Sequence, residues 1–247
     1  MPKQFRADLH IHTCLSPCAE IDMSPVSVVK KASERGLDII AVTDHNSAEN
    51  IVAAVKSAEN TGLSVLAGME ITSSEEAHIL ALFDNLDSIL KLQNIVYHNL
   101  IEGENDEKLF GEQVVANEKD EVMSFNKKLL IGATTMTAHS IVSEVHALDG
   151  LAIASHIDRG AFSIISQLGF IPGDLPFDAL ELSSAISRGK AQEVFKDYDS
   201  FAWISSSDAH TPDDIGKRTT VFHMHDSTIN EMRLALKGID GRRVEWE

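Results

Sequence analysis

The chain has 247 residues, of which 43% are hydrophobic and 24% are charged, a composition typical of one globular domain with a sizeable core. Its formal net charge of −17 opposes binding to duplex nucleic acid or to an anionic membrane, since both are bound through Lys and Arg. We therefore do not expect long nucleic acid or a membrane as partners, whereas bound cations would still permit a small anionic substrate.

Compartment is indicated by three further features. No apolar run approaches the roughly 20 residues that span a bilayer. A strand-like stretch begins within a few positions of Met1, which leaves no room for a signal peptide. Cys14 and Cys18 are the only cysteines, so a disulfide framework is not expected. We predict a cytoplasmic protein, and the sequence gives no indication of its oligomeric state.

The first part of the chain alternates strands with helices. Residues 5–12 predict a strand, and Ser24 and Pro25 begin a helix that ends at Gly36. Further elements are expected as a strand at 37–43, a helix at 48–60, and strands at 63–67 and 77–83. This alternation favours a parallel sheet covered by helices.

Between about residues 85 and 137 the pattern changes to mixed helix, interrupted by a charged turn at 102–108. We interpret this segment as a helical insertion or cap within a single domain that spans residues 1–247. Alternation then resumes with a helix at 138–148, strands at 151–155, 179–182, 202–205 and 219–223, and a last helix from Ser227 to Gly238.

Six successive strand ends carry an ionisable group. In a barrel of parallel strands those ends converge on one face, where sites are built. An open doubly wound sheet would not bring so many of them together. The sequence therefore predicts an α/β barrel.

Histidines carry most of the functional information, because eleven of them is a high count for this length. His10 and His12 stand two apart on the first strand, so both point to one side and can bind the same ion. An isolated pair of this kind is weak evidence, since two half-buried histidines bonded to carbonyl groups would look the same.

The later strand ends add more imidazoles and acids. They contribute Asp44, His45, Glu70, His78, His156, Asp208 and His210. A glutamate such as Glu70 can bridge two ions, because each of its oxygens can bind one. Imidazoles mixed with carboxylates suit zinc, manganese or iron, whereas thiolate-rich sets suit structural zinc. The set predicts a centre of two or three divalent ions.

These residues lie in motifs that resemble the PHP (polymerase and histidinol phosphatase) domain family of metal-dependent phosphoesterases. The motifs are DLHIHT (8–13), TDHN (43–46), GMEI (68–71), ASHIDR (154–159) and SSDAH (206–210), in the family's order. The similarity covers about residues 6–84 and 138–225. It implies a distorted (β/α)7 TIM-like barrel with a trinuclear metal centre.

The resemblance also implies a ligand set for each ion. The implied ligands of the first ion are His10, His12, Glu70 and Asp208. Those of the second are Glu70, His78 and His156, and those of the third include His45 and His210.

One position departs from the family pattern. Many members with small-molecule substrates have an aspartate five residues after the second histidine, where this chain has Pro17. Others have a histidine one residue later, where this chain has Cys18. A thiolate is a competent zinc ligand, so we interpret Cys18 as the residue that completes the third site. Glu20 or Asp22 would substitute if the loop folds inward, and without any of them the centre would hold two ions firmly.

The expected reaction is hydrolysis of a small phosphorylated metabolite or nucleotide. Metal coordination lowers the pKa of a water from about 15.7 to about 7, and the resulting metal-bound hydroxide would attack phosphorus. Asp208 and His210 are the candidates for proton transfer. Arg159 is the best placed phosphate ligand, because a guanidinium matches two phosphate oxygens, although a surface salt bridge would explain it too. Lys217 and Arg218 are weaker phosphate-binding candidates.

Other functions fit the same residues. Amidohydrolase barrels use similar ligands, so a C–N or ester bond is an alternative target. The departure at Pro17 and the unassigned middle segment would also suit a non-catalytic, metal-stabilised scaffold. Cleavage of short oligonucleotides stays open as well. The second H-x-H pair, His223 and His225, lies outside the ordered motif series, and we do not expect it to bind metal.

Overall fold

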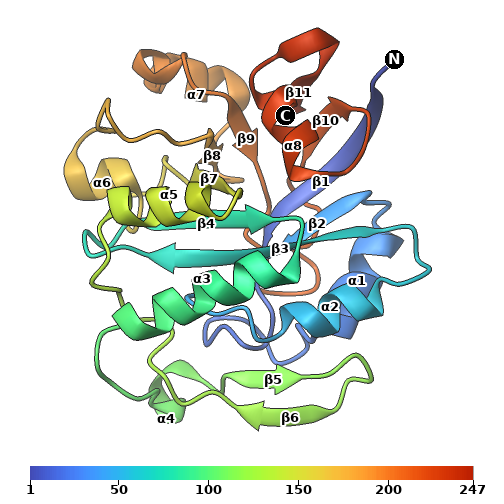
Figure 1. Ribbon diagram of the computed structural model, residues 1–247, viewed down its shortest axis with the longest axis vertical. Coiled ribbons are helices and arrows are strands. Elements are labelled where there is room, and N and C mark those ends of the chain that lie inside the picture. Colours follow the sequence, from blue (N-terminus) through green and yellow to red (C-terminus); the bar gives the residue numbers. More distant parts are fainter. Residues whose placement is uncertain (247) are drawn as a thin grey trace.

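Nine strands form one sheet that curls into a nearly closed barrel in the computed structural model, which describes residues 1–246 (Figure 1). The strands follow around the barrel in the order β11 (Arg243–Trp246), β10 (Thr220–Met224), β1 (Lys3–Ile11), β2 (Ile39–Val42), β3 (Ser64–Thr72), β4 (His78–Phe83), β7 (Leu151–Ala154), β8 (Ala179–Leu182) and β9 (Trp203–Ser205). The α/β TIM-like barrel that the sequence predicts is confirmed.

Strand direction differs from the expectation in one place that matters for the site. β1, β2 and β3 are parallel to one another, as are β7, β8 and β9, whereas β10 runs antiparallel to both β1 and β11. β4 instead runs antiparallel to both β3 and β7, so the sheet is mixed rather than fully parallel. This reversal brings the first residue of β4, His78, beside Thr72 at the end of β3. His78 thus reaches the same end of the barrel as residues that follow the other strands.

The segment after β9, one edge strand of the sheet, returns to the end of β1. The backbone N–H of His12 donates to the carbonyl of Ala209 at 3.0 Å, and the N–H of Ala209 donates to the carbonyl of His10 at 3.2 Å. These bonds join the segment after β9 to the end of β1, although about 200 residues separate the two in sequence. The pair His10 and His12 is thereby held beside the pair Asp208 and His210.

Helices cover the outside of the sheet. They are α1 (Pro25–Glu34), α2 (Ile51–Ser57), α3 (Leu86–Asn99), α5 (Ala138–Ala147), α6 (Ile164–Leu168), α7 (Arg188–Val194) and α8 (Ile229–Leu236), with a short α4 (Glu107–Phe110) in the insertion. The predicted cap Ser24 is confirmed, because its side chain accepts from the N–H of Ser27. The predicted cap of the last helix is wrong by one residue. Thr228 caps α8, whereas Ser227 hydrogen-bonds to Ser64.

None of the helices within residues 1–246 combines the length and hydropathy that crossing a bilayer would require.

Alternation along the strands separates two apolar cores. Side chains that point into the barrel, such as Leu66, Leu80 and Ile153, form a cluster that fills its interior. The larger cluster lies between the sheet and the helices and includes Met69 and Ile79. Glu70 lies two and four residues beyond Gly68 and Leu66 on β3, so it shares their inward face and stands above the apolar filling. The interior is therefore apolar at one end and polar at the other.

The insertion expected between 85 and 137 is partly helical and partly a hairpin. α3 packs against β3 and β4 as a regular barrel helix. The excursion from the barrel follows it and contains α4 and a two-stranded sheet of β5 (Val114–Ala116) and β6 (Val122–Phe125) (Figure 1). The hairpin was not predicted, because three- and four-residue strands leave little periodicity in a sequence.

A glycine permits close packing of β3 below the site. A Cβ atom at Gly68 would lie 2.6 Å from Cγ2 of Thr43 and 2.8 Å from the carbonyl oxygen of Val42. We expect Gly68→Ala to lower the free energy of unfolding by about 1–3 kcal/mol, the usual cost of overpacking a core. Urea unfolding measures this difference. Gly189→Ala in α7, where a Cβ meets nothing within 4 Å, is the control and should be neutral or slightly stabilising. Equal stability of both variants would refute the packing argument.

Candidate metal centre

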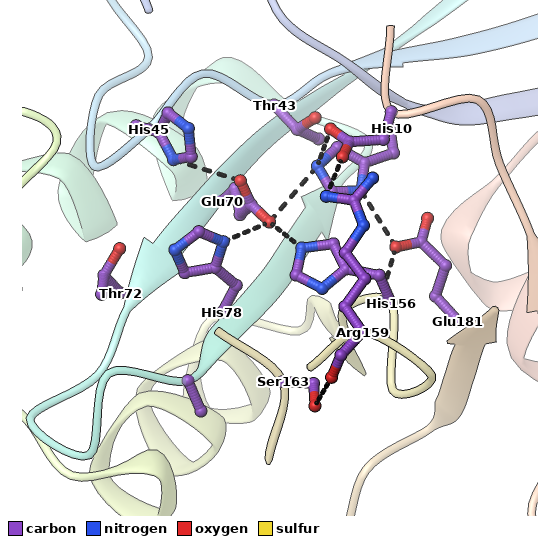
Figure 2. A network of polar contacts seen from close by, with 12 residues as sticks. His10, Thr43, His45, Glu70, Thr72, His78, His156, Arg159, Ser163 and Glu181 are labelled. Atoms are coloured by element: carbon purple, nitrogen blue, oxygen red, sulfur yellow. Dashed lines mark hydrogen bonds and ion pairs between the residues drawn. The ribbon is translucent and has the colours of Figure 1, made fainter. Parts of the chain in front are cut away.

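Histidines at the ends of four strands, β1, β2, β4 and β7, converge on Glu70, which is buried on β3 (Figure 2). Its Oε1 atom lies 2.9 Å from Nδ1 of His78, 3.2 Å from Nε2 of His156 and 3.3 Å from Nε2 of His10. Its Oε2 atom lies 3.1 Å from Nδ1 of His45. The same Oε2 atom lies 3.5 Å from Nε2 of His12, so one carboxylate faces five imidazoles, and each of its two oxygens has imidazole neighbours of its own.

A second carboxylate, Asp208, completes the group around the first strand. Its Oδ1 atom lies 3.2 Å from Nε2 of His10 and 3.1 Å from Nε2 of His12. The two Nε2 atoms are themselves 3.1 Å apart. Two imidazole nitrogens and a carboxylate oxygen thus point at a common position, which is the arrangement that a divalent ion requires of its ligands.

A third group lies on the solvent side of the first two. It comprises His12, Cys18, His45 and His210, whose ligand atoms all lie within 4.8 Å of one another. Sγ of Cys18 is 3.1 Å from Nε2 of His210. Glu20 and Asp22 are exposed, and neither belongs to the clusters found among residues 1–246. The inward-folded loop that would use them is therefore not adopted here.

Backbone strain marks two of these positions. His156 has φ of +29° and Asp208 has φ of +51°, values in the left-handed region that side-chain-bearing residues seldom adopt. Such strain costs on the order of 1–3 kcal/mol and persists only where surrounding structure imposes it. Both residues follow a barrel strand directly or closely, so the chain turns sharply there and aims each side chain inward.

The charge states suit cation binding. Burial and the nearby His210 lower the pKa of His12 to about 4, so its imidazole is neutral near pH 7 and retains a lone pair. Burial alone would raise the pKa of Glu70, but the adjacent His78 and His10 hold it well below its usual range. Burial would likewise raise the pKa of Asp208, and His10 and His12 outweigh it and lower that pKa. Both carboxylates are therefore ionised. Burial also lowers the pKa of His45 well below its usual range. The pKa of His10 is instead raised well above its usual range, because the nearby Asp208, Glu181 and Glu70 outweigh the effect of burial. Imidazoles beside ionised carboxylates fit zinc, manganese or iron.

A second layer of polar groups orients the histidines, and the sequence did not reveal it. Oε2 of Glu181, on β8, lies 2.9 Å from Nδ1 of His10 and accepts from the backbone N–H of His156 at 3.1 Å (Figure 2). Oγ of Ser16 lies 3.0 Å from Nδ1 of His12. Such contacts fix which imidazole nitrogen faces the metal. The available signal was the single carboxylate in the otherwise apolar strand 179–182.

Asp44 does not belong to the ligand clusters and instead stabilises a loop beside them. Its carboxylate accepts hydrogen bonds from Thr13 and Ser16, in the loop that leads to Cys18. Burial raises the pKa of Asp44 despite these bonds. Asp44 therefore holds the loop in place from below. Cys14 is buried in the same loop, as a small apolar residue would be.

The three basic candidates are placed differently. Arg159 is 43% exposed, and its Nη1 atom lies 2.6 Å from Oδ2 of Asp208, at the edge of the clusters. Lys217 pairs with Asp214 at 2.7 Å. Arg218 donates from Nη2 to the carbonyl of Ile186 at 2.6 Å. Arg159 therefore directly contacts a member of the clusters. His223 lies 3.4 Å from Glu245 and has no part in the clusters.

Glu181→Gln should weaken metal binding by about 10- to 100-fold, as loss of an orienting partner typically does. The reason is that a neutral amide no longer polarises His10 or fixes its tautomer. Calorimetric titration of metal-free protein with Zn²⁺ or Mn²⁺ measures the change, and excess metal should rescue the variant. Glu34→Gln, on the exposed face of α1, is the control. Unchanged affinity in Glu181→Gln would show that the contact with His10 is incidental.

Known proteins share this sequence pattern and this fold. The model of the PHP domain family matches residues 8–166. A protein of Methanocaldococcus jannaschii without an assigned function is 33% identical over 91 residues, which cover 34% of this chain and 53% of that protein. The structure of the lesion-specific endonuclease Q from Pyrococcus furiosus has a TM-score of 0.75 at 21% identity, over 98% of this chain and 58% of the endonuclease.

A third similarity is to a two-domain protein from Bacteroides vulgatus with a predicted PHP-like metal-dependent phosphoesterase. Its TM-score is 0.58 at 18% identity, and it covers 100% of this chain and 65% of that chain. At these identities the solved structures show a shared fold. This chain spans little more than half the length of the endonuclease and of the Methanocaldococcus jannaschii protein.

One expectation is overturned by these findings. A structure of endonuclease Q, with the same fold, holds a 27-mer duplex with an abasic lesion at its active site. The prediction that long nucleic acid is not a partner was therefore wrong. It relied on the net charge of the whole chain. Formal charge counts buried acids such as Asp8, Asp44 and Glu181 equally with exposed ones. It carries no information about the field at the site, which bound cations would dominate.

The described site unites the motifs DLHIHT, TDHN, GMEI, ASHIDR and SSDAH at one end of a TIM-like barrel, and the family model covers well over half of the sequence. This chain belongs to the PHP domain family of metal-dependent phosphoesterases.

Proposed function

We propose that this chain hydrolyses a phosphoester of a nucleotide, either free or within DNA, at a centre of two or three divalent ions. The observation that carries the proposal is the meeting of Glu70 and Asp208 with imidazoles around shared positions. Carboxylates buried against histidines contribute little to stability without a cation, because burying charges costs more than their attraction returns. Likeness to endonuclease Q supports a nucleotide substrate.

The proposed ligands follow the assignment that the family motifs imply. His10, His12, Glu70 and Asp208 would hold the first ion, Glu70, His78 and His156 the second, and His45, His210 and Cys18 the third. When bound, the ions would supply an acidified water as nucleophile and would offset negative charge on the phosphoryl group.

The chain's own side chains would position the substrate. Arg159 holds Asp208 at 2.6 Å while 43% of its side chain is exposed, so its remaining N–H groups are available to two phosphoryl oxygens. Asp208 and His210 are our candidates for carrying the proton to the leaving group, since Nδ1 of His210 lies 3.6 Å from Oδ1 of Asp208. Lys217 and Arg218 are secondary phosphate ligands in this proposal, and Lys217 would have to leave Asp214 to serve.

Arg159→Ala should reduce kcat/KM for a phosphoester by about 10²- to 10³-fold, the range for loss of one preorganised group that stabilises transition-state charge. The measurement is steady-state kinetics with added Mn²⁺. Arg188→Ala, at an exposed position that begins α7, is the matched control and should change little. A surface salt bridge with no role in the reaction predicts equal activity in both variants.

The function itself is tested with a substrate panel. Phosphomonoesters, nucleotides, oligonucleotides with and without an abasic site, and amides are incubated with metal-loaded protein, and phosphate release or strand cleavage is followed. Phosphoester turnover that His156→Ala abolishes supports the proposal. Amide turnover without phosphoester turnover would favour a C–N hydrolase. A scaffold predicts no turnover at all, with His156→Ala lowering only the melting temperature.

A further inference from the structure

A cavity of about 270 Å³ lies where the insertion meets the loop after β1. It is lined by Pro17, Cys18, Leu109, Phe110 and Ile131. Cys18 also belongs to the outer cluster, since its Sγ lies 3.1 Å from Nε2 of His210. The cavity and the candidate metal centre therefore share a wall.

Four of the five side chains that line the cavity are apolar, and two of these are exposed to solvent. Leu109 is 72% exposed and Phe110 is 36% exposed. Among the five lining side chains only the Cys18 thiol is polar, and a thiol is a weak hydrogen-bond donor. Large apolar side chains exposed at the mouth of a polar site are a typical mark of ligand contact.

The insertion is hydrogen-bonded to the loop after β1, which carries Cys18. The N–H of Val114, at the start of β5, donates to the carbonyl of Cys14 at 2.9 Å. Nδ2 of Asn50 donates to the carbonyl of Val114 at 3.0 Å. A Cβ at Gly111, which follows Phe110, would lie 3.1 Å from the carbonyl oxygen of Pro17. The end of α4 is thus packed directly on the loop, and the cavity does not depend on a loosely attached segment.

Pro17 and Cys18 line this cavity from the side of the loop after β1, and Pro17 adds an apolar surface beside the thiol. The insertion supplies the opposite wall through Leu109, Phe110 and Ile131.

We propose that this cavity binds the nucleobase of the substrate, with Phe110 as its stacking surface. The inference rests on the proposed phosphoesterase function. Among the organic groups that phosphoesters carry, sugars need hydrogen-bonding side chains, and long alkyl chains need a longer channel. A flat ring suits the volume, because apolar cavities of about 150 Å³ already bind benzene. Stacking on an aromatic ring tolerates any base.

The test compares two ligands that differ only in the base. Thymidine 5′-monophosphate and 2-deoxyribose 5-phosphate, each as its non-hydrolysable phosphonate, are titrated calorimetrically into metal-loaded protein. We expect the base-carrying ligand to bind about tenfold more tightly, the fold-change for about 1.4 kcal/mol of stacking. Phe110→Ala should remove this preference and leave the affinity for the sugar phosphonate unchanged. Phe170→Ala, at a 58% exposed phenylalanine outside this cavity, should retain the preference.

Two failures are distinguishable. Equal binding of the two ligands by the unaltered protein, or a preference that survives in Phe110→Ala, would overturn the base-binding site while phosphoester hydrolysis stands. If neither phosphonate binds and no phosphoester is hydrolysed, the proposed function falls and the base-binding site falls with it.

Discussion

Removal of divalent metal should abolish phosphoester hydrolysis and lower the melting temperature by roughly 5–11 °C. The thermal shift follows from mass action, since a free ligand at about 100 times its Kd stabilises a fold by about 2.7 kcal/mol. For a domain of this size each kcal/mol corresponds to roughly 2–4 °C. The physical reason is the packing of Glu70 and Asp208 with imidazoles in the barrel interior, where an ion replaces solvation that the buried groups have lost.

The experiment is dialysis against a chelator, followed by calorimetry and assay before and after adding back Zn²⁺, Mn²⁺ or Fe²⁺. Restoration by one ion and not by another would identify the preferred metal. Mg²⁺ is the comparison ion, because it prefers oxygen ligands and should restore little. Full stability and activity after exhaustive chelation, with metal analysis showing none bound, would eliminate the metal centre as the basis of function.

Glu70→Gln should reduce kcat by at least about 10²- to 10³-fold, the range for loss of one preorganised electrostatic group in a buried site. Glutamine keeps the shape of glutamate and loses its charge. Oε1 of Glu70 lies 2.9 Å from His78, a proposed ligand of the second ion, and Oε2 lies 3.5 Å from His12, a proposed ligand of the first. A neutral amide cannot bridge two cations as a carboxylate does, so both inner ions should be affected by this one change.

Two readouts accompany the kinetics of Glu70→Gln. The metal-dependent gain in melting temperature should shrink, and metal analysis should find fewer ions per chain. Glu59→Gln, an exposed residue after α2, is the control and should match the unaltered protein in all three measurements. Retention of full metal content and activity in Glu70→Gln would show that Glu70 is not a ligand of the two inner ions.

Much of the architecture was predictable because it depends on local patterns. Alternating apolar runs and capping residues such as Ser24 identify most elements, since a helix cap acts on N–H groups within one turn. Glu70 was predicted to follow a strand at 63–67, whereas β3 continues to Thr72 and carries Glu70 within it. A pair of ligands within one short segment, such as His10 and His12, can be recognised without knowledge of the tertiary structure.

Other features depend on contacts between distant residues and could not be read from sequence. Nothing in residues 77–83 specifies that β4 runs antiparallel, since strand direction is set by neighbouring strands and turns. Glu181 became recognisable as an orienting residue only when β8 placed it 2.9 Å from His10, 171 residues away. The nucleic-acid expectation failed for a related reason, because net charge sums over the chain while recognition depends on the field at one place.

The amino-acid sequence by itself determined the strand and helix content, the family motifs and the types of ligand, because these follow from near neighbours and from side-chain chemistry. Only the tertiary structure decided which imidazole faces which carboxylate, that Cys18 approaches His210, and that the insertion walls a cavity beside them. Those distances arise when the barrel closes and brings Ala209 against His10 and His12, and chain closure is a property of the whole sheet.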